Sequence, residues 1–335
     1  MEAEPLAGQA SVLPECVPRE DLPASGGGRN GAGGTLLPCE LAGMLLYRLL
    51  TALIGIPVIL AAIWFGGYVF AGLVALLALI GLHEFYRLSA RLGARPAGEV
   101  GYLIGLAFLL SAQAKSALSF PHEILALGLT ALLIIAALGW EIQRRREAPT
   151  LLSAGATVAG CLYVPFLFSF LILIRGGFEA ATEPVAPLAL SGWDFGGRLV
   201  LLLFLVSWAT DTAAYFVGRG LGRHKLAPSI SPGKTIEGSV GGLIGAAIIG
   251  GIFGRAFGLS LVHALLLSAA MGAFGQVGDL AKSRLKREAG VKDFGALFPG
   301  HGGVLDRFDS LLFNAPLAYY YLSVLMPAAC APWPL

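Results

Sequence analysis

The chain has 335 residues, of which 56% are hydrophobic and only 13% carry a charge. A mean hydropathy of +0.76 excludes an ordinary soluble domain, and the apolar runs are long enough to span a lipid bilayer. The net charge of +2 gives no sign of a nucleic-acid partner. The four cysteines are scattered without a CxxC pair, which argues against a zinc site and against a disulfide framework.

Residues 1–43 are rich in Gly, Pro, Ala and Glu and show no apolar periodicity, so we predict a disordered extension. They lack the basic start and apolar core of a signal peptide. Met44 opens a sequence that leads straight into the first apolar run, and we hypothesise that translation starts at or near it. We therefore expect two parts, the extension 1–43 and an integral membrane domain 44–335.

The apolar segments after Met44 predict an all-α fold, a polytopic transmembrane helical bundle of about nine spans. Most are close to the roughly 20 residues that a helix needs to cross a bilayer. The expected spans are 49–65, 68–86, 99–114, 122–140, 151–174, 199–217, 238–257, 260–280 and 310–328. Short breaks at Gly66-Gly67 and Gly258-Leu259 predict tight helical hairpins.

The distribution of Lys and Arg sets the expected orientation. With a cytoplasmic N-terminus, the inner segments from Met44 onward receive 17 basic residues and the outer segments receive 4. Because basic residues are concentrated in cytoplasmic loops, this split predicts the N-terminus inside and the C-terminus outside. The inner loops 218–237 and 281–309 then face the cytoplasm, where nucleotides are found.

Charge is concentrated in the stretch Gly278–Ser310, which holds four aspartates, one glutamate, one histidine and six Lys or Arg within 33 residues. Ionisable groups are costly near lipid, and membrane proteins that gather them usually use them for chemistry or transport. A positive cytoplasmic loop without chemistry is the simpler interpretation of charge alone.

Two aspartates lie in or at the end of apolar spans. Asp211 shares a helical face with Tyr215, and an intramembrane aspartate is a functional candidate or a structural hydrogen-bonding group. Asp279 shares a face with Ser283 and Arg287 at the inner end of the eighth span. A salt-bridged helix end is the alternative interpretation there.

Asp306 and Asp309 are three residues apart and share a face if the last helix begins near Leu305. Helix capping would account for one carboxylate at this position, but not for two in a single turn close to Asp279. Hard oxygen ligands at a wet membrane edge suit Mg²⁺, which keeps waters and bridges carboxylates to phosphates. We therefore expect Mg²⁺ here.

Two glycine-rich segments offer further binding groups. The loop Gly218–Gly238 carries Ser231 and Lys234 and could hold polyphosphate, although Pro228 stands where a Walker A motif needs glycine. A positive inner loop explains it equally well. The segment around His301 is a sharp connection that allows close backbone approach, and without a GxSxG element it does not indicate a serine hydrolase.

Fixed positions in the charged stretch match a known signature. They are Ser283, Leu285, Lys286, Arg287, Lys292, Asp293, Pro299, His301, Gly302, Gly303, Val304, Asp306, Arg307, Phe308 and Asp309. This pattern closely resembles that of the phosphatidate cytidylyltransferases, or CDP-diacylglycerol synthases. The similarity extends to Asp211, to Ser231–Gly238 and to the start of the first span. Gly233 departs from the family, which often has a second basic residue before Lys234.

The resemblance implies roles for individual residues. Asp279, Asp306 and Asp309 would be metal ligands and, with Lys286 and Arg287, catalytic residues. Phosphate-facing or substrate-binding residues would be Ser231, Lys234, Asp211, Ser283, Arg307 and His301. The implied cofactor is Mg²⁺, with or without a second, monovalent or divalent, cation. The implied partners are CTP, phosphatidic acid and the bilayer of the cell membrane; a homodimer is compatible with the resemblance, and nucleic acid is not expected.

The expected reaction is transfer of CMP from CTP to phosphatidic acid with release of pyrophosphate. A phosphate monoester has a second pKa of about 6, so the lipid is largely ionised and needs no strong general base. A CTP-dependent kinase of a lipid alcohol is the alternative enzyme, with His301 or Asp211 as its base. An ion-coupled transporter is a third interpretation, but it predicts inverted repeats that the sequence does not show.

Overall fold

The computed structural model describes residues 53–118, 121–144, 149–180, 192–295, 302–326 and 330–332. The predicted extension 1–43 and the proposed start at Met44 lie outside these ranges, as does His301.

Helices make up most of the described chain. Their bounds are Leu53–Phe65, α2 (Gly67–Arg91), α3 (Gly98–Leu118), α4 (His122–Gln143), α5 (Thr150–Cys161), α6 (Leu167–Gly177), α7 (Phe195–Leu221), α8 (Ile236–Ala256), α9 (Leu261–Glu288) and α10 (Leu305–Tyr320). Single π-helical turns, η1 (Leu162–Phe166) and η2 (Tyr321–Leu325), join α5 to α6 and extend α10. Each predicted span overlaps one of these helices or, for 151–174, the continuous run from α5 to α6.

Six of the described helical segments are long and apolar enough to cross a membrane: α2, α4, the run Thr150–Gly177, α7, α8 and α9. This supports the predicted all-α, multi-spanning class. The two predicted hairpin breaks are also present, because Gly66, Gly67 and Gly258 all have positive φ angles that favour glycine.

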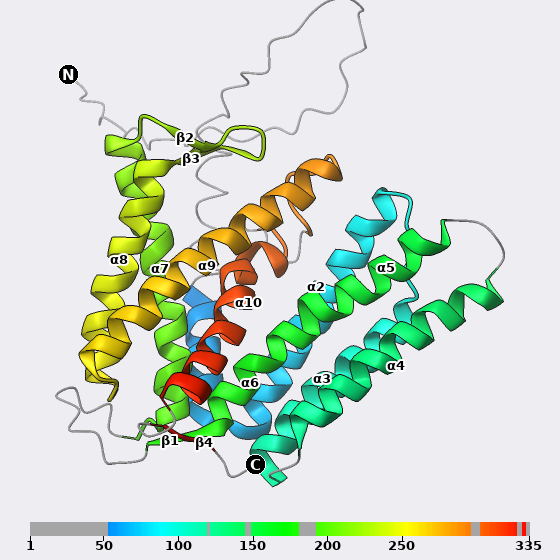
Figure 1. Ribbon diagram of the computed structural model, residues 1–335, viewed down its shortest axis with the longest axis horizontal. Coiled ribbons are helices and arrows are strands. Elements are labelled where there is room, and N and C mark those ends of the chain that lie inside the picture. The colour runs from blue at the N-terminus through cyan, green and yellow to red at the C-terminus, as the bar shows by residue number, and fades with distance from the viewer. Residues whose placement is uncertain are drawn as a thin grey trace, which may run out of the picture.

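Two short antiparallel sheets accompany the helices and were not predicted. Strand β1 (Phe178–Ala180) pairs with β4 (Cys330–Pro332), and β2 (Lys225–Ala227) pairs with β3 (Ser231–Thr235). The second pair converts most of the loop expected at 218–237 into a hairpin. In Figure 1 this hairpin lies beyond the upper ends of α7 and α8, and the β1–β4 pair lies at the lower end of the bundle.

The helices form two groups with α10 between them (Figure 1). One group contains α7, α8 and α9, and the other contains α2 to α6. Close packing of α8 on α7 depends on small residues: a Cβ added to Gly241 would lie 2.6 Å from the side chain of Val217, and one added to Gly245 would lie 2.5 Å from Ala213.

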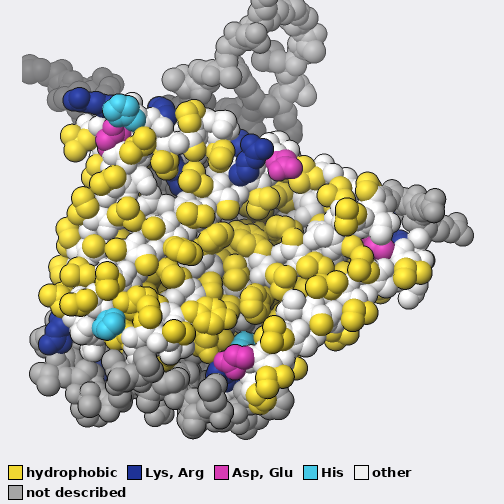
Figure 2. All heavy atoms as spheres, viewed as in Figure 1, with side chains coloured by type: hydrophobic (Ala, Val, Ile, Leu, Met, Phe, Trp, Pro, Cys, Tyr) yellow, Lys and Arg dark blue, Asp and Glu magenta, His cyan; other side chains and the backbone are white. Residues whose placement is uncertain are grey.

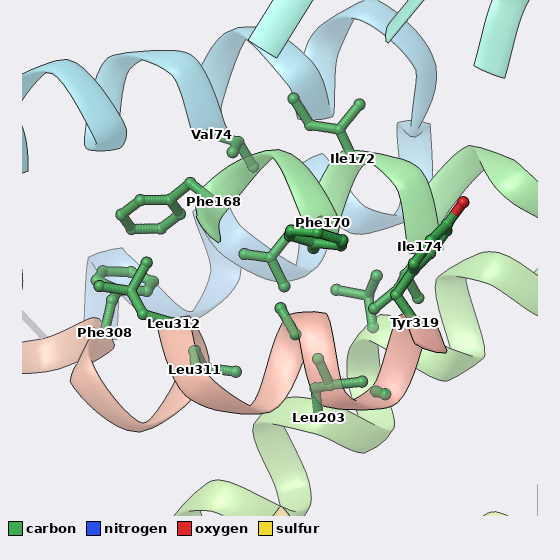
Figure 3. Packing of buried hydrophobic residues seen from close by; sticks show 14 of the residues in the cluster. Val74, Phe168, Phe170, Ile172, Ile174, Leu203, Phe308, Leu311, Leu312 and Tyr319 are labelled. Atoms are coloured by element: carbon green, nitrogen blue, oxygen red, sulfur yellow. The ribbon is translucent and has the colours of Figure 1, made fainter. Parts of the chain in front are cut away.

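The two groups share a core in which α6 lies between α2 and α10 (Figure 3). Phe168 of α6 packs against Phe308 of α10 with 5.7 Å between ring centroids, and Phe170 lies 5.4 Å from Tyr319 in the same way. Because α10 is held along its length by this core, the position of its N-terminal turn, which carries Asp306 and Asp309, is fixed.

The outer surface is apolar over most of its height. Figure 2 shows hydrophobic side chains covering the middle of the visible face, while Lys, Arg, Asp, Glu and His lie towards its upper, lower and side margins. So large an area of exposed hydrophobic side chains would favour aggregation in water, but it matches a lipid environment.

Candidate active site

The charged centre of the molecule consists of Asp279 and Asp309, which share one lysine. The Nζ atom of Lys282 lies 2.8 Å from Asp279 Oδ1 and 2.6 Å from Asp309 Oδ2. Asp279 and Lys282 are three residues apart on α9, and Asp309 faces them from near the N-terminal end of α10. The lysine side chain is only 11% exposed, so these charges are poorly screened by water.

A second lysine reaches the centre from the hairpin. Lys234 of β3 forms an ion pair with the other oxygen of Asp279, and Arg287 of α9 donates from Nε to the carbonyl of Ile230, 3.3 Å away. These two contacts connect the hairpin to the C-terminal half of α9. The basic loop, which the sequence left open as a polyphosphate-binding loop or a plain positive loop, thus contributes a charge directly to the centre.

The hairpin is positioned by the start of α8. Thr235 is the N-cap residue, and its hydroxyl accepts a hydrogen bond from the amide of Gly238. Glu237 accepts hydrogen bonds from the amides of Arg223 and His224, which fixes the chain entering β2. Lys234 therefore sits immediately before a capped helix rather than on a free loop.

Asp306 is held apart from the other two aspartates. One of its oxygens is 2.7 Å from Lys286 Nζ, and the other accepts hydrogen bonds from the amides of Phe294 and Gly303 at 2.9 and 3.0 Å. These partners occupy both carboxylate oxygens. Asp306 thus ties the connection between α9 and α10 to the start of α10, which differs from the predicted grouping of three aspartates.

Glu84 of α2 caps α10 from a distant part of the sequence. Its two oxygens accept hydrogen bonds from the amides of Val304 and Leu305 at 2.9 and 3.0 Å, and the side chain is buried. A Cβ on Gly295 or Gly303 would lie 2.5 Å or less from the Glu84 carboxyl group, so glycine is required at both positions. A buried carboxylate thereby satisfies helix amides that have no partner within α10.

The remaining sequence candidates come from α7, β3, α9 and α10. Asp211 of α7 interacts electrostatically with Asp279, Lys282 and Lys234. Ser231 begins β3 and Ser283 follows Lys282 on α9, both half-buried, while Arg307 is exposed in the first turn of α10. His301 lies outside the described residues.

Sequence reasoning missed two residues of this arrangement, Lys282 and Glu84. The signal for Lys282 was present, because a lysine three residues after Asp279 lies on the same helical face. No local signal could identify Glu84, because its partners are 220 and 221 residues away in the chain.

The predicted metal site requires Asp279, Asp306 and Asp309 to converge on one ion. Within the described part of the chain, no group of three or more His, Cys, Asp and Glu side chains is close enough to hold an ion. Asp279 and Asp309 do converge on a single ammonium group. Two carboxylates fit Mg²⁺, which commonly takes one or two protein carboxylates and completes its shell with water and substrate phosphates.

This set of groups is suited to binding phosphorylated molecules at a membrane surface. Lys234, Lys282 and Lys286 provide ammonium groups, and Asp279 and Asp309 provide oxygens for a cation. No serine or cysteine nucleophile paired with a base is formed by the described residues at this centre. Fold and site together define a polytopic helical membrane protein with a charged, phosphate-adapted centre at one end of the bundle.

Comparison with known proteins identifies the family to which this chain belongs. Residues 46–325 match the sequence profile of the cytidylyltransferase family, and the chain belongs to that family. It is 33% identical over 297 residues to a phosphatidate cytidylyltransferase of Synechocystis sp., covering 84% of this chain and 97% of the relative. It is 32% identical to the phosphatidate cytidylyltransferase of Bacillus subtilis, covering 83% and 97%. A third, from Staphylococcus haemolyticus, is 35% identical, with 81% and 96% covered.

Proposed function

We propose that this protein transfers CMP from CTP to phosphatidic acid, giving CDP-diacylglycerol and pyrophosphate for phospholipid synthesis. The observation that carries the proposal is the convergence of Asp279, Asp309, Lys282 and Lys234 at the end of an apolar helical bundle. Relatives of nearly the same length are phosphatidate cytidylyltransferases, which supports the same substrates for this chain.

The reaction is a substitution at phosphorus. An oxygen of the lipid phosphate attacks the α-phosphorus of CTP and forms a new P–O bond. The bond from that phosphorus to the oxygen bridging to the β-phosphate breaks, and pyrophosphate leaves with the electron pair. Because the attacking oxygen is already ionised, the main barrier is the repulsion between two anions.

The lysines lower this repulsion. Lys282 and Lys234 are held next to Asp279 by ion pairs, and we assign to them the phosphates of the two substrates, together with Arg287 and Arg307 at the rim. Fixed cations in a poorly solvated site stabilise developing negative charge more strongly than mobile ions in water. Lys286 is engaged by Asp306 and would act mainly by keeping the α9–α10 connection in place.

We assign a Mg²⁺ ion to the carboxylates of Asp279 and Asp309, which would hold it through their side-chain oxygens. When bound, Mg²⁺ supplies charge neutralisation and alignment of the phosphate groups. Asp306 is left out of the ligand set because one of its oxygens is held by the backbone amides of Phe294 and Gly303, whereas Asp279 and Asp309 pair only with lysine side chains in the interactions described above. Ser231, Ser283, Asp211 and His301 stay as candidates for binding substrate.

We further propose nine spans with the charged centre on the cytoplasmic side of the cell membrane. The excess of Lys and Arg in the segments around the centre supports this orientation. The β2–β3 hairpin and the C-terminal end of α9 lie at the same end of the bundle (Figure 1), as one cytoplasmic face requires. CTP would then reach the centre from water, and the lipid from the inner leaflet.

The test is to supply the purified protein in lipid vesicles with Mg²⁺, CTP labelled in the cytidine and either phosphatidic acid or a polyprenol. We expect label in a CDP-lipid only when phosphatidic acid is present. The same mixture with CTP labelled in the γ-phosphate should yield labelled pyrophosphate and no labelled lipid. A phosphorylated alcohol would instead establish a lipid kinase, and no lipid product of either kind would refute the proposal.

A further inference from the structure

An apolar groove runs along α10 on the side of the molecule, and its lining starts one helical turn after Asp309. It has a volume of about 670 Å³ and is lined by side chains of α6, α9, α10 and η2 with almost no polar surface. The lining residues are Leu167, Phe274, Phe313, Pro316, Leu317, Tyr320, Tyr321, Val324 and Leu325. Figure 2 shows a hollow lined by hydrophobic side chains in the middle of the face on which α9, α10 and α6 meet.

The two main walls of the groove continue directly into the charged centre. On α10, Leu317, Phe313 and Asp309 follow one another at intervals of four residues, and such residues share one face of a helix. On α9, Phe274 is followed at the same interval by Gly278 and Lys282. The same two helical faces are therefore apolar along the groove and charged at its upper end.

Helices α9 and α10 are in contact between the groove and the charged centre. A Cβ on Gly278 would lie 2.8 Å from both the carbonyl oxygen of Asp309 and the ring of Phe313. The lining of the groove therefore starts at Phe313, one helical turn after Asp309, and extends from there along α10 towards the opposite end.

The third wall brings an unused polar group to the same level. Tyr163 of η1 lies one helical turn before Leu167, and its ring is 6.3 Å from that of Phe313. Its hydroxyl is buried and has no hydrogen-bond partner among the described residues. A buried hydroxyl without a partner costs free energy, and π-helical turns such as η1 frequently occur at functional sites.

We propose that this groove holds one acyl chain of the phosphate-bearing lipid substrate, with Tyr163 donating a hydrogen bond to an oxygen between the chain and the phosphate. The inference rests on the proposed function for the identity of the lipid. It deepens that function by assigning the course of the chain: the phosphate lies at Lys282, the ester region beside Tyr163 and Phe313, and the chain along α10 to Leu325. From Phe313 to Leu325 the helix rises by about 18 Å, a length suited to a long acyl chain.

The groove acts by placing the lipid rather than by attracting it. Lipid tails are as apolar as leucine side chains, so moving a chain from the bilayer into the groove releases little free energy. A chain fixed along α10 instead restricts the directions in which the phosphate can point. Orientation of this kind is a recognised contribution to catalysis of reactions between two bound substrates.

The direct test is photolabelling with phosphatidic acid that carries a diazirine at one position of an acyl chain. With the full-length protein in vesicles, a group near the middle of the chain should label Leu317 and its neighbours. A group at the chain end should label the segment around Val324 and Leu325. An excess of unlabelled phosphatidic acid should suppress both, whereas phosphatidylcholine should not.

Other labelling patterns would contradict the proposal. Labelling that spreads over the exposed faces of α4 and α8, or that phosphatidylcholine suppresses as well, would show ordinary boundary lipid and overturn the proposal. Labelling of the groove that only a second copy of the chain prevents would assign the groove to a subunit interface and would also overturn it. Specific labelling of the groove in a protein that makes no CDP-lipid would refute the proposed function but would still support the assignment of the groove.

A variant provides a kinetic test. Leu317→Trp places a large ring in the groove two turns from Asp309, which removes the fixed path of the chain and should lower kcat with phosphatidic acid by about tenfold. The KM for CTP should not change. Ile248→Trp on the exposed face of α8 is the matched control and should alter neither value. An unchanged kcat for Leu317→Trp would contradict the assignment.

The role of Tyr163 has its own variant. Tyr163→Phe keeps the ring against Phe313 and removes only the hydroxyl. We expect a rise in the KM for phosphatidic acid of about tenfold, with an unchanged KM for CTP and a thermal stability at least equal to that of the parent, because a buried hydroxyl without a partner is removed. An unaltered KM for phosphatidic acid would remove Tyr163 from the proposed lipid site.

Discussion

Two aspartates near the start of α10 differ in the groups that bind them. Asp306 is bound by Lys286 and by the amides of Phe294 and Gly303, so its charge is used to join two segments of the chain. Asp309 forms an ion pair with Lys282, and it shares that lysine with Asp279. The first pattern is typical of a structural carboxylate and the second of a carboxylate available to a ligand.

This difference predicts separate effects of the two substitutions. Asp306→Asn leaves Lys286 without its carboxylate in a poorly exposed position and should lower the free energy of unfolding by about 3 kcal/mol. Asp309→Asn should change stability less, because Lys282 keeps its ion pair with Asp279. Thermal unfolding in detergent micelles measures both, and Asp293→Asn on the exposed connection is the control.

For metal affinity, Asp309→Asn should have the larger effect and Asp306→Asn the smaller, which is the reverse of their effects on stability. If Asp279 and Asp309 hold Mg²⁺, Asp309→Asn should weaken binding of Mn²⁺, followed by electron paramagnetic resonance, by at least about tenfold, or about 1.4 kcal/mol. Asp306→Asn should leave this affinity nearly unchanged in the fraction that stays folded. Equal losses of Mn²⁺ affinity in the two variants would restore Asp306 to the ligand set.

At the scale of elements, the start of α10 depends on α2. Glu84 supplies the acceptors for two α10 amides, which connects residues at the two ends of the described chain across the bundle. Helix amides buried without an acceptor cost about 1–3 kcal/mol each. The cap from α2 therefore determines where the turn carrying Asp306 and Asp309 lies.

Removing this cap should destabilise the protein and disturb the site together. Glu84→Ala should lower the free energy of unfolding by about 3 kcal/mol and reduce turnover, while Glu84→Gln should retain part of both because it keeps one acceptor oxygen. Glu288→Ala, an exposed glutamate at the end of α9, should fall within about 0.5 kcal/mol of the parent. A Glu84→Ala protein as stable as the parent would show that water replaces the carboxylate.

The sequence predicted helices well and contacts between distant elements poorly. Apolar length and period placed every expected span on a helix, because a chain in lipid must satisfy its backbone hydrogen bonds within each segment. The hairpin β2–β3 was missed, since its strands are short, polar and interrupted by proline. The pairing of Lys282 with Asp309 and of Glu84 with α10 depends on how helices pack, which no local pattern encodes.

At the scale of the whole molecule, the hairpin and the far end of α8 should lie on opposite sides of the membrane. Lys225 belongs to β2 and Arg255 lies in the last turn of α8, and both are exposed. The 21 residues of α8 rise by about 31 Å, which matches the roughly 30 Å of a bilayer core. The concentration of basic residues predicts that the Lys225 side is cytoplasmic.

Cysteine labelling tests this orientation. In a variant whose native cysteines are replaced by serine or alanine, Lys225→Cys should react with a membrane-impermeant maleimide in inside-out vesicles and not in intact cells. Arg255→Cys should show the opposite behaviour, and each variant serves as the control for the other. Reaction of both cysteines from one side would mean that α8 does not span the membrane. Reversed labelling would place the charged centre away from cytoplasmic CTP, and the proposed reaction could not proceed in that orientation.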